Sequence, residues 1–191
     1  MLRKLTIGLG LMTMTWPLGA QDPAAYKSEY LAELQYTSNN VIALAKAMPA
    51  EKYGWRPGPG VRSVSEVYVH IAAGNFILLD IIGQKAPEDL YGAVKASGRE
   101  RPMALAKRNA ELEKTVAEKQ RVVALLERSL AAVREADEKA GAADLDKTVN
   151  FFGRDKTARA VFLRILVHVN EHMGQSVAYA RVNGIVPPWS N

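Results

Sequence analysis

The chain has 191 residues, 48% hydrophobic and 24% charged, which is the size and composition of one ordinary globular domain. It contains no cysteine, so disulfides, thiolate nucleophiles and cysteine-ligated metals are excluded, and any metal site must use nitrogen or oxygen ligands. The formal charge is +5, but Lys and Arg alternate with Asp and Glu in segments such as ELEKTVAEKQR, which is typical of a solvated helix face. We therefore expect no nucleic-acid partner.

Residues 1–20, MLRKLTIGLGLMTMTWPLGA, have the layout of a secretory signal peptide: two cations, an uncharged apolar run, and Gly-Ala at the end. We expect cleavage before Gln21 and an exported protein, periplasmic or extracellular, whose domain spans 21–191. The apolar run is short and Pro17 interrupts it, so we expect no stable membrane anchor. Removing the two cations of the leader lowers the formal charge to +3.

Two helical patterns occupy the first half of the mature chain. The first runs from about Pro23 to Met48 and is followed by the turn-rich segment KYGWRPGPGVR. The second begins at Ser63-Val-Ser-Glu66, which matches a capping box, where the serine hydroxyl and the carboxylate three residues later bind the first free backbone N–H groups. It continues to Gly83, at the place where a C-terminal glycine is expected.

Residues 85–102 are polar and contain several prolines and glycines, so we expect a long connection with room for a helical turn. Such a connection allows neighbouring helices to run other than strictly up and down. A second capping-box match, Thr115-Val-Ala-Glu118, predicts the start of a third helix that ends at Gly141. Its apolar residues recur at spacings of three and four: Val122, Leu126, Leu130 and Val133.

The last third of the chain begins with DLDKTVNFFGRDKTAR, which predicts an irregular link with a turn at Gly153-Arg154. A fourth helix is expected from about Thr157 to Asn183, where Asn-Gly stops it. No segment of the chain indicates a sheet. Four amphipathic helices in a domain of this size predict an all-α fold, a four-helix bundle.

Two of the three histidines fall in the segment HVNEHMGQ of the fourth helix, four residues apart. Side chains at this spacing point the same way, one turn apart, and are close enough to bind one ion together. They continue the face that begins apolar and consists of Val161, Ile165, His168, His172, Gln175 and Tyr179. Both imidazoles should therefore face the interior of the bundle.

The third histidine, His70, lies on the inward face of the second helix, with Gly74 one turn further on. A glycine inside a helix costs ~1 kcal/mol against alanine, and room for a ligand beside His70 would explain it. Three neutral imidazoles and one open position form the arrangement of a catalytic zinc site. Nickel or ferrous iron would also accept imidazole ligands.

Two other interpretations use the same residues. Inward histidines can be core residues that hydrogen-bond to a carbonyl or a carboxylate. The segment from His168 to His172 also matches H-x-x-E-H, an inverted zinc-protease motif with Glu171 as the general base. Those proteases take a third ligand from further along the chain, and no Glu, Asp or His follows His172. The protease interpretation therefore fails, whereas the core interpretation stays open.

Three segments resemble the DinB-like family: EKYGWRPGPGVRSVSEVYVHIAAGN, ELEKTVAEKQRVVALLERSLAAVREA and HVNEHMGQSVAYARVNGIVPPWS. This family consists of small four-helix proteins regarded as metal-dependent enzymes, and its superfamily includes bacillithiol and mycothiol S-transferases and maleylpyruvate isomerases. The resemblance implies a metal triad of His70, His168 and His172, occupied by zinc or nickel. It also implies that the chain can form a homodimer.

These observations leave three hypotheses. In the first, the protein is a metal-dependent enzyme for an unidentified small substrate, and Glu171, Gln175 and Asn75 orient ligands or carry protons. Thiol transfer is known among relatives, but their thiols are cytoplasmic, so hydrolysis suits an exported protein better. In the second, the protein binds a metal or small ligand without catalysis. In the third, the histidines belong to a purely structural bundle.

Overall fold

The computed structural model describes residues 23–190, so the expected leader, residues 1–20, lies outside the described residues. The described chain is mostly helical, with one small hairpin before the last helix. The elements in chain order are α1 (Pro23–Ala47), η1 (Ala50–Lys52), α2 (Val64–Ile81), α3 (Glu88–Tyr91), η2 (Gly98–Glu100), α4 (Arg101–Thr115), α5 (Lys119–Lys139), α6 (Ala142–Asp146), β1 (Thr148–Phe151), β2 (Arg154–Thr157) and α7 (Ala158–Val182).

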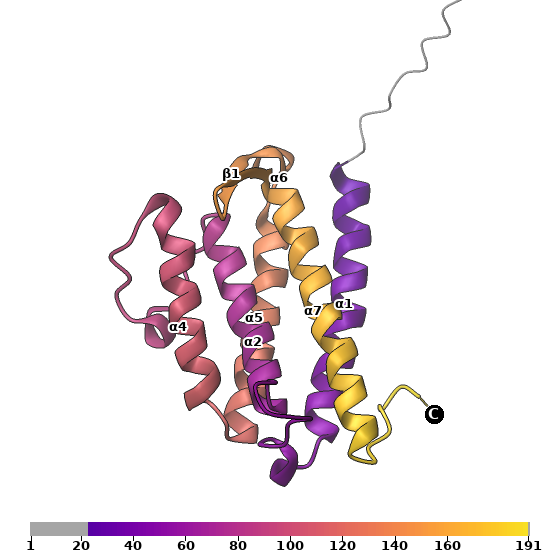
Figure 1. The fold of residues 1–191 in the computed structure, drawn as a ribbon. Helices are drawn as coiled ribbons and strands as arrows, with labels where there is room; N and C mark the ends of the chain where they lie inside the picture. The colour runs from indigo at the N-terminus through magenta and orange to yellow at the C-terminus, as the bar shows by residue number, and fades with distance from the viewer. Residues whose placement is uncertain (1–22, 191) are drawn as a thin grey trace, which may run out of the picture.

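Helices α1, α2, α5 and α7 form a four-helix bundle, and α4 packs against the outside of α2 (Figure 1). Within the bundle, α5 and α7 each contact both α1 and α2. The side chains between these helices form one continuous hydrophobic core, to which α4 adds Leu105. The predicted fold class, an all-α four-helix bundle, is confirmed.

Hydrogen bonds between helices define their directions. Lys27 near the start of α1 donates to the carbonyl of Glu138 near the end of α5, so these helices are antiparallel. Tyr26 donates to the carbonyl of Arg159, so α1 and α7 start at the same end. Tyr179 near the end of α7 donates to the backbone just ahead of α2. Consequently α2 and α5 run parallel, as the long connection between them allows, because α4 carries the chain back.

The predicted helix boundaries hold for α2 and α7. Ser63 and Glu66 form the expected capping box, in which Glu66 N lies 3.3 Å from Ser63 Oγ and Ser63 N lies 2.7 Å from Glu66 Oε2. Thr157 caps α7 by accepting a hydrogen bond from the N–H of Ala160. After α7, Gly184 adopts a positive φ of 74°, which ends the helix at the Asn-Gly pair as predicted.

Helix α4 was not predicted, and the expected start of the third helix at Thr115 is wrong. Thr115 is the last residue of α4, and its hydroxyl donates to the carbonyl of Glu111. Helix α5 begins at Lys119, and the side chain of Glu118 accepts two backbone N–H groups of its first turn. The sequence matches a capping box, but the residue that caps α5 is Glu118 and not Thr115.

The segment expected to be an irregular link without strands contains an antiparallel hairpin, β1 and β2. Its turn is formed by Phe152 and Gly153, with φ of 49° and 87°, one residue before the predicted position. Positive φ at both central residues fits the twist of a two-residue hairpin loop. The hairpin lies at the end of the bundle where α7 begins (Figure 1).

Helix α2 is the most apolar element of the fold. Within residues 23–190 it is the helix with the length and mean hydropathy, 1.3, that could span a bilayer. However, 72% of it is buried inside the bundle, where it contacts α4, α5 and α7. Burial on several sides explains why this helix is nearly continuously hydrophobic.

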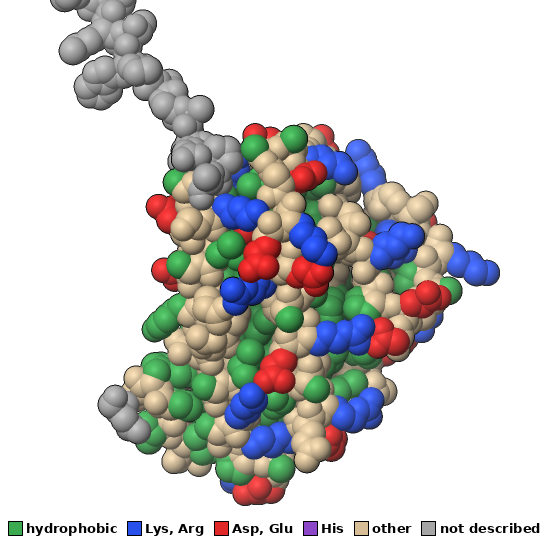
Figure 2. Space-filling model, turned by 180° about the vertical axis from the view of Figure 1, so that it is seen from behind, with side chains coloured by type: hydrophobic (Ala, Val, Ile, Leu, Met, Phe, Trp, Pro, Cys, Tyr) green, Lys and Arg blue, Asp and Glu red, His purple; other side chains and the backbone are tan. Residues whose placement is uncertain are grey.

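Charged side chains of both signs are intermixed on the face of the molecule that Figure 2 shows. Several are paired across or along helices, such as Arg134 with Glu138 at 2.8 Å. This arrangement follows the alternation of charges that the sequence indicates.

One ionisable group is buried in the core away from the histidines. Asp137 on α5 is fully buried, and neither carboxylate oxygen has a hydrogen-bond partner among the described residues. The hydroxyl of Tyr30 on α1 is also buried and unpartnered within this part of the chain. Burial raises the pKa of Asp137 to about 6, with the charge of Glu138 adding to the rise and that of Lys27 opposing it.

We expect Asp137→Asn to stabilise the protein above neutral pH. Because the folded pKa lies above the unfolded value of ~3.9, the folded state retains the proton longer, and stability falls between about pH 4 and pH 6. The amide cannot ionise, so the variant should gain roughly 3 kcal/mol at pH 8 and little near pH 4. Chemical unfolding across this pH range measures the difference.

The matched control is Asp155→Asn, at an exposed position on β2. It exchanges the same two side chains without removing a buried carboxyl group, so it measures the effect of the substitution alone. A destabilised Asp137→Asn protein at pH 8 would contradict the expectation, since it would mean that the ionised carboxylate is favourably paired.

Candidate metal centre

The structure brings the three histidines together between α2 and α7, where His168 is buried and His70 and His172 are half-buried. His70 comes from α2, and His168 and His172 come from successive turns of α7. One ring nitrogen from each lies within 4.8 Å of those of the other two. The Nε2 atoms of His70 and His168 are 3.2 Å apart, and the ring centroids are separated by 4.7–5.0 Å. The two helical faces predicted to carry these residues therefore converge at one point.

The close approach of α2 and α7 at this point depends on Gly74. A Cβ atom at Gly74 would lie 2.5 Å from Cε1 and 3.0 Å from Nδ1 of His168. The first separation is shorter than real Cβ atoms show and the second is very tight, so any side chain here would displace the imidazole. The glycine was expected to make room for a ligand beside His70, but the space that it provides is occupied by the ring of His168.

His70 is oriented by Glu113 on α4. Its Nδ1 lies 2.7 Å from Oε1 of Glu113, whose other oxygen accepts a hydrogen bond of 2.7 Å from Nε of Arg62. Burial raises the pKa of Glu113, but the hydrogen bonds from His70 and Arg62 outweigh it and hold the pKa below its usual value. Because the ionised carboxylate can only accept, Nδ1 of His70 carries a proton and donates it to Glu113. Nε2 is then the ring nitrogen of His70 that faces the cluster.

His172 is oriented by a chain of hydrogen bonds within α7. Its Nδ1 donates to Oε1 of Gln175 at 2.9 Å, because an amide oxygen can only accept. The amide nitrogen of Gln175 donates to the hydroxyl of Tyr179 at 2.8 Å, which in turn donates to the carbonyl of Arg62 at 3.1 Å. This chain leaves Nε2 of His172 unprotonated.

His168 has no comparable partner. Its Nδ1 is buried and lacks a hydrogen bond to any described residue, so packing against Gly74 positions the ring. Burial, followed by the charges of His172 and His70, lowers the pKa of His168 to about 3. Burial is also the main cause of the lowered pKa of His172. Neutral imidazole is the form that binds metals, so the donor set fits a divalent cation.

The predicted catalytic residues lie in three different surroundings. Gln175 contacts His172 directly. Glu171 is half exposed and forms a two-bond ion pair with Arg164, at 2.7 and 3.1 Å, which lowers its pKa. Asn75 is fully buried and donates to the hydroxyl of Ser129 on α5. The catalytic roles of these three residues stay predictions.

Sequence reasoning missed Glu113 and Arg62. Both were overlooked because α4 was not predicted, so nothing placed Glu113 beside the second helix. A signal was present: the buried residues Pro102, Leu105 and Asn109 recur at spacings of three and four, and Glu113 continues the series. A helix over this segment would have placed a carboxylate on the face that packs against α2.

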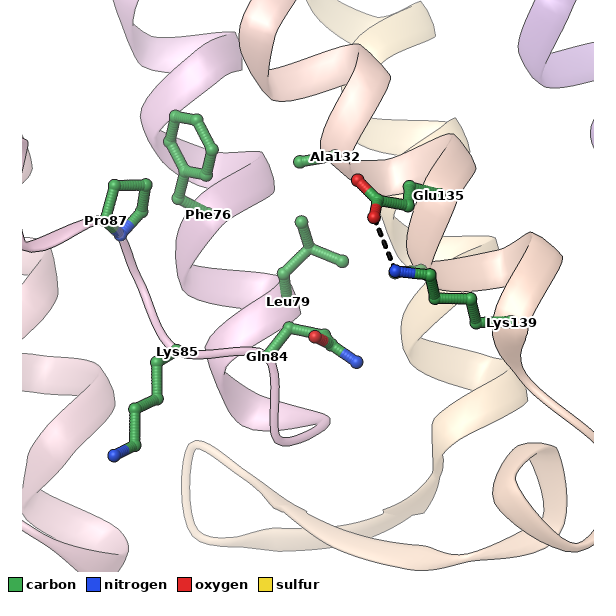
Figure 3. Close-up of a pocket in the computed structure, with 9 residues that line it drawn as sticks. Phe76, Leu79, Gln84, Lys85, Pro87, Ala132, Glu135 and Lys139 are labelled. Atoms are coloured by element: carbon green, nitrogen blue, oxygen red, sulfur yellow. Dashed lines mark hydrogen bonds and ion pairs between the residues drawn. The ribbon is translucent and has the colours of Figure 1, made fainter.

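Two hollows near α2 differ in chemistry. One, of about 160 Å³, lies between the C-terminal parts of α2 and α5, with Phe76 and Leu79 on one side and Glu135 paired to Lys139 at 2.5 Å on the other (Figure 3). The other, of about 400 Å³, is lined by His70 and His168. The second is therefore the candidate substrate cavity.

Metal sites of four-helix bundles are built from side chains on facing helices, and the three histidines of α2 and α7 could hold an ion in this way. The sequence model of the DinB superfamily matches residues 33–176, so the chain belongs to the DinB superfamily. No curated protein matches the chain.

Solved structures show the same fold. A DinB-like protein of Bacillus cereus has a TM-score of 0.64 at 18% identity, over 86% of this chain and 97% of the other. A conserved protein of Enterococcus faecalis has a TM-score of 0.61 at 16% identity, over 82% and 95% of the two chains. A DinB-like protein of Bacillus subtilis has a TM-score of 0.52 at 18% identity, over 83% and 94%. At these identities the similarity establishes the fold alone.

Replacing Glu113, whose carboxylate orients His70, should weaken metal binding by an amount that depends on the substituted residue. We expect Glu113→Ala to lower the zinc affinity ~10–100-fold, the usual effect of removing a residue that orients a metal-binding histidine. Glu113→Gln should have a smaller effect, because it retains an acceptor but loses the charge. Competition with a chromogenic chelator measures the affinity. Glu111→Gln, at an exposed position on the same helix, is the control, and an equal loss there would contradict the assignment.

Filling the space at Gly74 should weaken metal binding and should not give the stability that alanine usually adds to a helix. Gly74→Ala should lower zinc affinity at least ~10-fold because it displaces His168. It should also fail to gain the ~1 kcal/mol that alanine normally contributes within a helix. Gly174→Ala in α7, where a Cβ meets no atom within 4 Å, should gain that stability and retain the affinity. Metal titration and thermal unfolding of both variants test this, and unchanged affinity in Gly74→Ala would refute it.

Proposed function

We propose that the protein is a metal-dependent enzyme whose centre is formed by His70, His168 and His172. The ion is divalent, with zinc or nickel favoured and iron acceptable to the same ligands. One observation carries the proposal: ring nitrogens of three histidines lie within 4.8 Å of one another beside a cavity of about 400 Å³. Three protein ligands leave a coordination position for substrate or water, as in catalytic zinc sites.

The residues of the chain supply binding and orientation. Glu113 and Gln175 each hold one histidine in the tautomer that directs Nε2 inward, and Gly74 admits the third ring. A divalent ion, when bound, supplies Lewis-acid chemistry and makes water in its open position acidic near neutral pH. Burial lowers the pKa of His168 and His172, so these two imidazoles bind near neutral pH without first losing a proton.

We assign different tasks to Glu171 and Gln175. Gln175 orients His172, which is a positioning role. Glu171 is an ionised carboxylate next to His172 in the sequence, and it could accept a proton once its pair with Arg164 opens. Asn75 would act only indirectly, through the packing of α2 against α5.

We favour hydrolysis of a small substrate over thiol transfer, because the predicted leader directs the protein away from cytoplasmic thiols. Export itself is a proposal that rests on residues 1–20.

A homodimer is also proposed. Leu163 and Val167, exposed by 51% and 41% and one turn apart on α7, provide an apolar patch that a second copy could cover.

The metal content of the protein tests the proposal. The protein is purified without an imidazole column or added metal, beside His168→Ala and His172→Ala. We expect about one zinc, nickel or iron ion per chain, lost in both variants. A protein with no metal, and no thermal stabilisation on adding zinc or nickel, would leave the structural bundle as the explanation.

If the metal is present, ester, amide and thiol-transfer substrates are screened with the loaded protein and with the two histidine variants. Activity that requires both histidines supports an enzyme. A loaded protein that is inactive throughout this screen would favour a binding protein without catalysis.

A further inference from the structure

The cavity beside the histidines has a definite chemistry that the metal centre does not explain. Its volume of about 400 Å³ lies within the range of small-molecule sites. It is an open cavity lined by residues of α2, α4, α7 and the hairpin. His70 and His168 form part of its wall, which places any occupant next to the proposed ion.

Most of the wall is apolar. Ile77 and Leu78 of α2 face two alanines of α4, and the hairpin contributes Phe151 and Phe152. The two phenylalanine rings pack edge to face, with centroids 5.1 Å apart. This surface suits a compact aromatic or branched aliphatic group rather than a sugar or a nucleotide.

Phe152 is unusual in both conformation and exposure. It is 42% exposed, and it is the non-glycine residue with positive φ, 49°, among those that the structure describes. A bulky residue rarely adopts this conformation, and the exposed ring gains little from burial. Its position at the hairpin turn places it in the cavity wall, where a bound apolar group would cover it.

The charged groups of the wall indicate an anion. Arg62 and Arg164 are its cations and Glu113 is its acid. Glu113 already holds Arg62, whereas Arg164 is paired with Glu171, which is half exposed and lies outside the wall. Exposed ion pairs contribute only ~0–1 kcal/mol, so Arg164 can exchange Glu171 for an anion in the cavity at little cost.

We propose that this cavity binds an apolar monocarboxylate, with Arg164 holding the carboxylate and Phe152 covering the apolar body. In the metal-free protein, one carboxylate matches the single excess positive charge of the wall, and a guanidinium can bind it through two parallel hydrogen bonds. The inference deepens the proposed function, on which it rests for the reaction, by naming the substrate class. Binding itself does not require the metal.

Calorimetric titration tests the inference with phenylacetate and its neutral analogue phenylacetamide. Both the zinc-loaded and the metal-free protein are used. We expect phenylacetate to bind at least about tenfold more tightly than the amide, as expected for hydrogen bonds to a charged group. This preference should be lost in Arg164→Gln. Glu171→Gln is the matched control, because it frees Arg164 and should retain or increase the preference.

Phe152→Ser should weaken both compounds to a similar degree, since it removes apolar cover from each. Equal binding of acid and amide, absence of binding by both, or a preference that survives in Arg164→Gln would overturn the inference. An acid preference that appears only with zinc and does not need Arg164 would assign the carboxylate to the ion instead, and would also overturn it.

Titrating both the zinc-loaded and the metal-free protein distinguishes a failure of this inference from a failure of the proposed function. If the protein takes up no metal but shows the Arg164-dependent preference, the cavity assignment stands and the metal centre fails. If it takes up metal in a histidine-dependent manner but shows no preference, only the substrate class fails.

Discussion

The contact between Gly74 of α2 and His168 of α7 is the constraint on which the site depends. The absence of a side chain at Gly74 lets the imidazole lie against the backbone of α2, and this brings the Nε2 atoms of His168 and His70 to 3.2 Å. His172 follows one helical turn later because the spacing on α7 is four residues. The site is therefore a property of two antiparallel helices and of one missing Cβ atom.

The four bundle helices place the histidines but do not orient all of them. His70 depends on Glu113, which belongs to the additional helix α4 outside the bundle. Arg101 at the other end of α4 pairs with Asp80 at the end of α2, at 2.7 Å, so α4 is fixed to α2 by an ion pair at one end and by the hydrogen bond between Glu113 and His70 at the other. Because α4 also forms a wall of the cavity, the orientation of one histidine and the shape of the cavity depend on the same packing.

The sequence predicts the parts of this arrangement that leave a local signal. Ser63 and Glu66 mark the start of α2, and the spacing on α7 identifies the face that carries His168 and His172. Helix α4 escapes prediction because it buries only three residues, Pro102, Leu105 and Asn109, on an otherwise polar helix. The hairpin escapes because its strands have four residues each, and those of β2 are all exposed. The structure of α4 and of the hairpin is therefore decided by the elements against which they pack, and not by their own hydrophobic patterns.

The histidine cluster gives the fold little stability unless something binds to it. Three imidazoles occupy positions that apolar side chains could fill, and Nδ1 of His168 is buried without a partner within the described chain. An ion that binds this arrangement, and not the unfolded chain, would stabilise α2 against α7 in proportion to its affinity and concentration. Unfavourable burial of polar groups is retained in proteins mainly where it serves a site. The unpartnered nitrogen, the helix glycine and the exposed Phe152 are all found around one cavity, which is the pattern expected of a functional site.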